Sequence, residues 1–229
     1  WRDFVAAFVS RYKGRGVRVF YEVENEVNAK AFWTGSPEDY VALLKETYQT
    51  IKASDPSALV LHAAMACGMT KDARGPVREK GLERHDGFLR RIFDSRAFDI
   101  ISTHDYYFPD QAVNGFTFGS YLDHIKALAA EYGVADRPLW VTENGYVTVP
   151  TKVGARMDPG SIGAQSRWLE GTVAQASDAG VDRMFWMLIA DRDEPYFGTM
   201  GLLENDGTSR PVCAVVRRVN EGGVKLDQR

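Results

Sequence analysis

The chain has 229 residues, of which 45% are hydrophobic and 12% aromatic, so it is long enough for one large domain and is not a low-complexity sequence. Its 28 basic and 31 acidic residues give a net charge of −3, and the basic residues form no run interleaved with aromatics. This pattern argues against nucleic acid as the main partner. No apolar stretch reaches the roughly 18 residues of a membrane span, so we expect a soluble protein with no membrane partner.

Two cysteines, Cys67 and Cys213, lie far apart and lack metal-ligand spacing, so neither a disulfide framework nor a zinc site is predicted. The first residues lack both an initiator Met and a signal-peptide core, and their apolar positions from Trp1 to Tyr12 follow helical spacing. We therefore expect the chain to begin within a helix that is part of a larger fold. The localisation is not predicted.

Short apolar segments then alternate with amphipathic ones along the chain. Ser36 and Pro37 suit the N-cap and first position of the second helix, and a long polar loop is expected from residue 65 to about 83. The expected strands cover residues 17–24, 58–64, 98–103, 139–142 and 183–189. Such an alternation requires parallel pairing through crossover helices, hence an α/β fold. No Ser- or Gly-rich linker interrupts it, so residues 1–229 are predicted to form a single domain.

An acidic cluster lies at the end of the first expected strand. Glu22, Glu24 and Glu26 share one parity, so one reading makes them the solvated face of an edge strand. Glu143, however, stands at the end of the 139–142 strand much as Glu26 stands at the end of the 17–24 strand. Parallel strands put both at the same edge of the sheet. Two carboxylates on one cleft suit glycoside hydrolysis, in which one protonates the leaving oxygen and the other attacks the anomeric carbon or activates water.

Other strand ends contribute aromatic and imidazole groups to this edge. Aromatic rings can stack on sugar faces, and hydroxyl or imidazole donors can hold a carboxylate in its ionised form. The side chains concerned are His104, Tyr106, Tyr146 and Trp186.

Residues 21–28 resemble the strand-four signature of clan A glycoside hydrolases, in which an aromatic residue precedes Asn-Glu-Pro and the Glu is the acid/base. Residues 140–145 resemble the strand-seven signature, whose Glu is the nucleophile. Residues 99–106 and 185–186 are similar to strands six and eight, and the loops at 32–33 and 206–211 are similar in pattern to family 39 and family 5 members. The resemblance implies a partial (β/α)8 TIM-type barrel of about five βα units with parallel strands.

The resemblance also implies roles for individual residues. Glu26 would be the general acid/base and Glu143 the nucleophile of a retaining enzyme for a β-linked glycoside, with carboxyl groups about 5 Å apart and no metal or organic cofactor. Asn25 would bind the sugar 2-hydroxyl, Tyr106 would orient Glu143, and Trp186 would form the floor of the first subsite, with His104 and Tyr146 lining the same site. Alternatively, Asn25 is a turn former, His104 a core histidine and Trp186 plain core.

Two features depart from the family pattern. The chain supplies only strands four to eight, and five strands cannot close a barrel of eight, so apolar interior and strand edges would be open. We expect either a homo-oligomer or completion by a missing N-terminal portion. Val27 replaces the usual Pro after Glu26 and loosens the following backbone, while Glu24 could raise the pKa of Glu26 or compete with it.

Two other functions stay open from the sequence. One is a carbohydrate-binding or interaction protein derived from a truncated barrel that keeps its carboxylates. The other is an esterase-type hydrolase using Ser102 and His104, although no Gly-x-Ser-x-Gly elbow is present. The sugar, the linkage and exo or endo action are not predicted.

Overall fold

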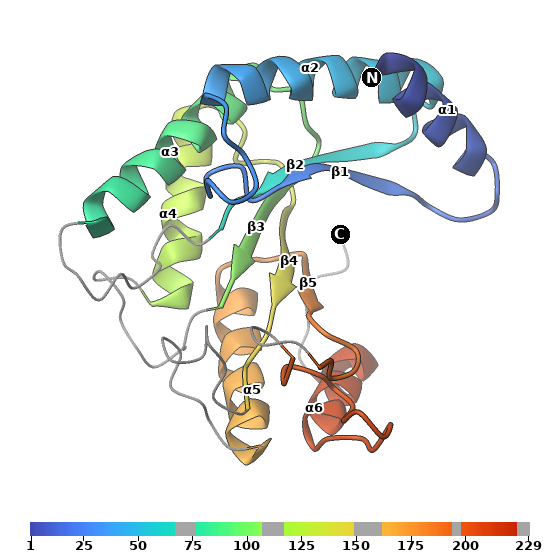
Figure 1. The fold of residues 1–229 in the computed structure, drawn as a ribbon. Coiled ribbons are helices and arrows are strands. Elements are labelled where there is room, and N and C mark those ends of the chain that lie inside the picture. Colours follow the sequence, from blue (N-terminus) through green and yellow to red (C-terminus); the bar gives the residue numbers. More distant parts are fainter. Residues whose placement is uncertain (67–76, 107–116, 149–161, 194–197, 224–229) are drawn as a thin grey trace. The chain divides into compact units, whose positions relative to one another are not determined.

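A computed structural model describes residues 1–66, 77–106, 117–148, 162–193 and 198–223 (Figure 1). Helices and strands alternate along the chain in about five βα units, which confirms the predicted α/β class. The helices are α1 Arg2–Tyr12, α2 Pro37–Ser54, α3 Val77–Ser95, α4 Phe118–Glu131, α5 Ile162–Asp178 and α6 Val212–Arg218, followed by a short π-helical turn, Val219–Gly223. The strands are β1 Phe20–Asn25, β2 Leu59–Ala64, β3 Ile101–Asp105, β4 Leu139–Asn144 and β5 Arg183–Trp186.

Several expected boundaries are wrong: β1 begins at Phe20 rather than at residue 17, and β3 covers Ile101–Asp105 rather than residues 98–103. Helix α3 begins at Val77, inside the expected polar loop. The Arg, Glu and Lys residues at its start have high helix propensity, and this part of the sequence lacks the apolar periodicity that would have predicted a helix. Strand β4 continues to Asn144, so Glu143 lies within the strand rather than after it. Strand β5 ends at Trp186 instead of residue 189, because Leu188 and Ile189 accept hydrogen bonds from Leu202 and Leu203 and so pair with another segment.

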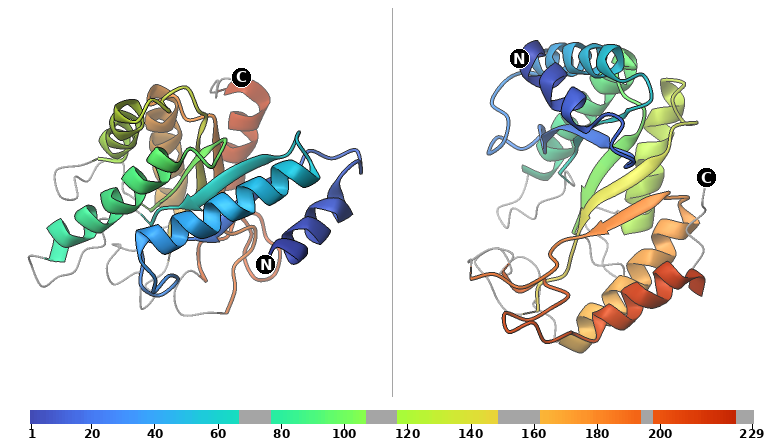
Figure 2. Two further views of the ribbon diagram at one scale, coloured as in Figure 1. Left: turned by 90° about the horizontal axis from the view of Figure 1, so that it is seen from above. Right: turned by 90° about the vertical axis from the view of Figure 1, so that its right-hand side faces the viewer.

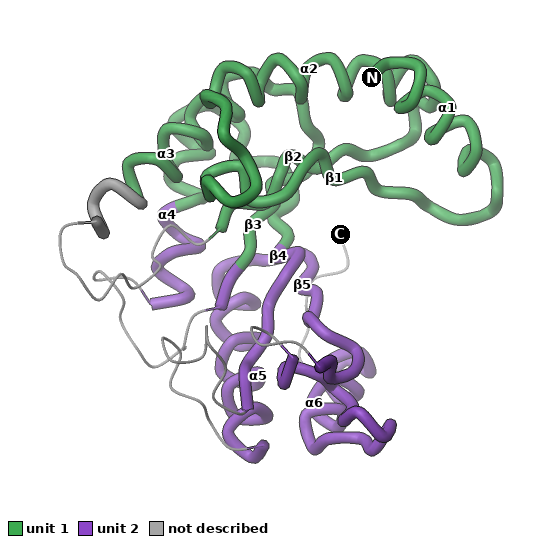
Figure 3. The backbone as a smooth tube through the Cα atoms, in the orientation of Figure 1, with its two compact units in different colours: residues 1–104, 125–140 green, residues 105–124, 141–229 purple. Residues whose placement is uncertain are grey.

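The chain divides into two compact units, residues 1–104 with 125–140 (unit 1) and residues 105–124 with 141–229 (unit 2) (Figure 3). The division falls inside β3, α4 and β4. The expectation of a single domain over residues 1–229 stays a prediction, and each unit is described by itself below.

The strands form a parallel pair, β1-β2, and a three-stranded sheet with the order β3-β4-β5. In the pair, Phe20 lies opposite Leu59 and Asn25 opposite Ala64. Parallel bridges from Leu61 to Ile100 and from Met65 to Thr103 continue the register from β2 to β3 within unit 1. The carboxyl ends of β1, β2 and β3 therefore share one edge.

Helix α2 lies along the β1-β2 pair in unit 1 (Figures 1 and 2). Ser36 and Asp39 form a capping box at its start, with Pro37 in the first turn, which confirms the predicted start. Its apolar stripe packs into a core shared with β2 and α3. The fully buried members of that core include Tyr40, Leu44, Ile51, Val60, Phe88, Ile92, Phe93 and Phe98.

Helix α1 packs beside α2 through a hydrogen bond from Trp1 Nε1 to Thr47 Oγ1 (2.8 Å) and an ion pair between Arg2 and Glu46. It also carries a row of aromatic rings in mutual contact, with centroids 5.1 to 6.0 Å apart. The row consists of Trp1, Phe4, Phe8 and Tyr12, which are 37 to 61% exposed. We call these four residues the aromatic row.

In unit 2, helices α5 and α6 lie side by side and enclose a separate apolar cluster (Figure 2). Its buried members are Tyr146, Trp168, Leu169, Val173, Val212 and Val215, and Trp186 packs against it. Across the described parts of both units, no helix combines the length and apolarity needed to cross a membrane.

Candidate active site

In unit 1, the regular backbone of β1 changes at its carboxyl end. Glu24 and Glu26 have positive φ angles of 69° and 43°, a conformation that non-glycine residues rarely adopt. Because of these two left-handed residues, Glu22, Glu24 and Glu26 do not continue one alternating edge strand. The Glu26 amide still donates to Ala64 O at 3.0 Å, so the backbone of Glu26 stays attached to the end of β2.

A side chain from α2 enters the β1-β2 ladder just before this bend. The Ala63 amide donates to the Tyr40 hydroxyl (2.6 Å), and that hydroxyl donates to the Val23 carbonyl (3.0 Å). Tyr40 is fully buried, and burial raises the pKa of its hydroxyl so that it stays protonated. The phenol thus satisfies both backbone groups at the point where the strand departs from regular geometry. No sequence pattern indicated this role, because Tyr40 looks like one more core residue of α2.

The Glu26 side chain is held by a histidine from β3. His104 Nδ1 lies 2.8 Å from Glu26 Oε1, the imidazole is almost fully buried, and the carboxylate is partly exposed. The His104 amide donates to Met65 O at 2.9 Å, which fixes the backbone beneath the ring. Unit 1 therefore brings together Glu26 and His104, two of the predicted site residues. Asn25, the third, is the half-buried last residue of β1.

A second carboxylate of β1 binds a serine below this pair. Ser102 Oγ donates to Glu22 Oε1 (2.5 Å), and the Ala64 amide donates to the same oxygen (3.1 Å). A serine nucleophile must give its single hydroxyl proton to a base such as histidine. The Ser102 proton points to a carboxylate instead, so this geometry gives the esterase reading no support.

Strand β2 carries a buried histidine between these groups and the core. The Ser102 amide donates to His62 Nε2 (3.3 Å), and His62 Nδ1 lies 2.7 Å from Ala63 O, so Nδ1 carries the proton. Burial lowers the pKa of His62 to about 4. The imidazole is therefore neutral near pH 7 and acts as a hydrogen-bonding spacer between β2 and β3.

In unit 2, Glu143 projects from β4 and is half-buried. Tyr106 donates its hydroxyl to Glu143 Oε2 at 2.7 Å, and the same hydroxyl lies 3.0 Å from Met187 Sδ. A phenol donor stabilises the ionised carboxylate and fixes the direction of its second oxygen. Two positions further on, a Cβ on Gly145 would meet Met187 O at 2.4 Å, so the close approach of backbone requires glycine.

The two aromatic residues predicted to contact sugar lie in different surroundings of unit 2. Trp186 is half-buried, with its indole packed edge-on against Trp168 at 5.9 Å and its Nε1 donating to Met200 O at 2.9 Å. Tyr146 is only 6% exposed and packs against Trp168, with ring centroids 5.5 Å apart. Trp186 therefore keeps an accessible surface, whereas Tyr146 is mainly part of the core.

The comparisons with known proteins agree with this fold. The family model described as glycosyl hydrolase catalytic core matches residues 23–215. A monomeric β-xylosidase from Caulobacter crescentus CB15 superimposes with a TM-score of 0.69 at 22% identity, over 96% of this chain and 46% of that one. A glucosidase from Croceicoccus marinus gives 0.69 at 16% identity, over 96% and 45%.

A GH39 β-xylosidase from Caulobacter crescentus gives a TM-score of 0.67 at 25% identity, over 96% of this chain and 47% of that one. No curated protein sequence matches the chain. The chain thus spans about half the length of these solved structures, in agreement with a partial barrel.

Proposed function

The chain belongs to the glycosyl hydrolase catalytic core family, and from this premise we propose that it hydrolyses a β-linked glycoside by the retaining two-glutamate mechanism. The observation that carries the proposal is that each predicted carboxylate stands at the carboxyl end of a strand with a dedicated partner. Glu26 has His104 at 2.8 Å, and Glu143 has Tyr106 at 2.7 Å.

In the proposed first step, Glu143 attacks the anomeric carbon while Glu26 gives a proton to the departing oxygen. The phenol of Tyr106 binds Oε2 of Glu143 and so orients the carboxylate for this attack. In the second step, Glu26 removes a proton from water, which attacks the glycosyl-enzyme and releases Glu143. After Glu26 has lost its proton, His104 Nδ1 donates to it and stabilises the carboxylate until water restores the acid.

We further propose that Asn25 binds the sugar 2-hydroxyl and that the half-exposed indole of Trp186 forms the floor of the first subsite. The burial of Tyr146 favours a supporting position beneath that floor rather than direct stacking. Since several solved structures of similar fold are named as β-xylosidase or glucosidase, aryl β-xylosides and β-glucosides are the substrates to test first. The proposal includes no metal or organic cofactor.

The test compares Glu143→Gln and Glu26→Ala on two aryl glycosides, one with a good and one with a poor leaving group. Glu143→Gln should reduce kcat about 10⁴-fold or more on both, because the nucleophile is lost. Glu26→Ala should slow the poor leaving group by about 10²- to 10⁴-fold and the good one much less, because only the poor one needs a proton.

The matched controls are Glu38→Gln in unit 1 and Glu170→Gln in unit 2, both exposed carboxylates in surface ion pairs that should keep the parent rate. Parent-like hydrolysis by both active-site variants would show that the assignment is wrong. Sugar binding by calorimetry without release of reducing ends would instead establish the binding-protein alternative.

We also propose that unit 1 is covered by further protein, through association of identical copies or an N-terminal portion. Two observations support this. Among the described strands, β1 pairs only with β2, so its other edge is open, and the aromatic row of α1 is exposed. Such edges and patches are usually covered. Light scattering should give a mass above that of the 25.6 kDa chain; a well-folded monomer at working concentration would contradict association.

A further inference from the structure

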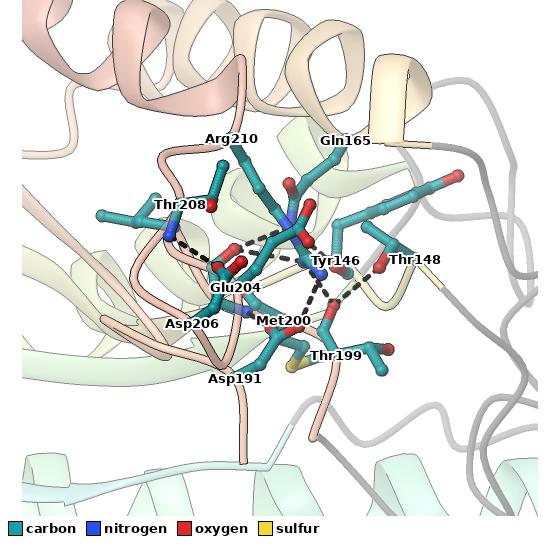
Figure 4. Close-up of polar contacts among 12 residues, drawn as sticks. Tyr146, Thr148, Gln165, Asp191, Thr199, Met200, Glu204, Asp206, Thr208 and Arg210 are labelled. Carbon is teal, nitrogen blue, oxygen red and sulfur yellow. Dashed lines mark hydrogen bonds and ion pairs between the residues drawn. The ribbon is translucent and has the colours of Figure 1, made fainter.

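Unit 2 contains a short segment whose three successive backbone carbonyls accept hydrogen bonds from side chains, and Figure 4 shows part of this arrangement around Arg210. Thr199 O accepts from Arg210 Nη1 (3.0 Å) and from Thr148 Oγ1 (3.0 Å). Met200 O accepts from Trp186 Nε1 (2.9 Å). Gly201 O accepts from Arg210 Nη1 (3.3 Å). We call residues 199–201 the clamped segment.

Arg210 and Asp191 form the centre of this arrangement. Arg210 Nη2 lies 2.5 Å from Asp191 Oδ2, and their side chains are only 5% and 8% exposed. The other Asp191 oxygen, Oδ1, accepts from the Gly201 amide at 2.8 Å. The guanidinium thus binds a carboxylate with one nitrogen and two carbonyls with the other, a fork that the single ammonium of lysine cannot reproduce.

The clamped segment has no freedom to move toward Asp191. A Cβ on Gly201 would lie 2.4 Å from both Asp191 N and Leu203 O. Gln165, which is fully buried, also directs its Nε2 at the carbonyls of Tyr146, Met200 and Gly201, at 3.3 to 3.4 Å. Close backbone contact and buried donors therefore fix the three carbonyls together.

This fixed segment touches both candidate site elements of unit 2. Its middle carbonyl, Met200 O, holds the indole of Trp186. Its Met200 side chain lies against Gly145, where an added Cβ would be 3.1 Å from the sulfur, two residues after Glu143. The hydrogen bonds of Arg210 reach Thr199, Gly201 and Asp191, so it would act on Trp186 through the segment.

We propose that Arg210 and Asp191 are positioning residues that set the orientation of the Trp186 indole, and through it the affinity for the sugar in the first subsite. This proposal rests on the proposed glycosidase function. If the buried pair only stabilised the fold, its substitution would lower the free energy of unfolding but leave the Trp186 indole of the folded protein in place. A positioning role requires the indole of the folded variant to move.

The test uses Arg210→Lys in the intact chain, because lysine keeps the charge and loses the fork. The first readout is the indole N–H signal of Trp186 in a ¹H–¹⁵N spectrum, assigned with Trp186→Phe. Arg210→Lys should shift that signal and speed its exchange with solvent, while the signals of Trp1 and Trp33 stay in place. Arg218→Lys, in the exposed pair with Glu170, is the matched control and should change nothing.

The second readout is kinetic. Because a stacking floor binds substrate and transition state alike, Arg210→Lys should raise KM for an aryl glycoside about tenfold and change kcat much less. An unchanged Trp186 signal in a folded variant would overturn the proposal, as would a loss confined to kcat. If Arg210→Lys fails to fold, Asp191→Asn is measured in the same way, with the same two outcomes.

The two readouts separate this proposal from the proposed function. If the parent chain hydrolyses no glycoside, the function fails, and the indole signal still decides whether Arg210 positions Trp186. If the parent is active and the Trp186 signal and KM are unchanged in the variants, the function stands and the positioning role fails.

Discussion

The two candidate carboxylates are placed by different means. In unit 1, Glu26 lies on a backbone that has left regular strand geometry, with two positive φ angles, a phenol inserted into the ladder and an imidazole as partner. In unit 2, Glu143 lies within a regular strand and is fixed by a phenol, by the close approach of Gly145 to Met187 O and by the neighbouring clamped segment.

The difference fits the separate tasks proposed for them. A nucleophile must meet one carbon from one direction, so a rigid strand with dense side-chain contacts suits Glu143. An acid/base must serve a leaving group and then a water, and Glu26 stands beside the His104 imidazole on a locally bent backbone. Unit 1 also holds three of the four histidines, all of them buried: His62, His85 and His104. Four substitutions or changes of pH test this difference between the two units.

The largest effect is expected from Gly145→Ala. The new methyl group would meet Met187 O at 2.4 Å, and two backbone segments would have to separate beside Glu143. We expect a loss of about 3 kcal/mol or more in the free energy of unfolding, measured by urea denaturation. Gly87→Ala in α3 is the control, since its Cβ meets nothing within 4 Å and should stabilise by about 1 kcal/mol. Equal results for both would show that β4 is not rigid.

Acid should destabilise unit 1 through His62. Its folded pKa of about 4 is below the unfolded value of 6.5, so the unfolded chain binds more protons between these values. The contribution of His62 to the free energy of unfolding is complete above pH 6.5. It decreases as the pH is lowered and is lost by about pH 4, a total change of about 3 kcal/mol.

Unfolding of the parent and of His62→Gln should be compared at pH 7 and at pH 4.5. The variant lacks the titrating group, so its stability should decline less over this interval. An identical decline in both proteins would mean that other groups cause the acid sensitivity.

Tyr40→Phe should cost about 2 kcal/mol, because the Val23 carbonyl and the Ala63 amide lose their shared partner inside the core. Denaturant unfolding measures the loss, and Tyr12→Phe on the exposed side of α1 should stay within about 0.5 kcal/mol of the parent. An unchanged free energy of unfolding for Tyr40→Phe would indicate that the Ala63 amide and the Val23 carbonyl find other hydrogen-bond partners without the hydroxyl.

The smallest effect is expected from Glu24→Gly. Glycine adopts a φ of 69° without the penalty paid by glutamate, so the variant should be more stable by roughly 0.5–1 kcal/mol despite its freer unfolded chain. Thermal unfolding measures the gain. A clear loss of stability would show that the Glu24 side chain contributes an interaction larger than its backbone strain.

The order of the elements could be predicted from the sequence because it depends on local patterns. Short apolar runs and the Ser36 cap are visible in a few neighbouring residues. The shortening of β5 was not predictable in this way, since Leu188 and Ile189 look like strand and pair with residues 202–203 instead.

The supporting groups of the site were missed for the same reason. Tyr40 and Gln165 look like ordinary helix residues, and the ion pair of Arg210 with Asp191 joins positions 19 residues apart in sequence. The pattern around Arg210 and Pro211 was recognised as family-like, but a buried guanidinium that binds one carboxylate and two carbonyls depends on tertiary contacts. Positive φ at Glu24 and Glu26 also had no local signal, because neither residue is glycine or asparagine.

The hydroxyl of Tyr40 also has a consequence for the order of folding. A parallel strand pair normally completes its ladder from its own backbone, but here one rung is supplied by a helix that precedes β2 in the chain. The β1-β2 pairing therefore cannot be completed before α2 has docked, so strand pairing and helix docking should belong to one cooperative folding step. In a chevron experiment, Tyr40→Phe should then slow refolding more than it speeds unfolding.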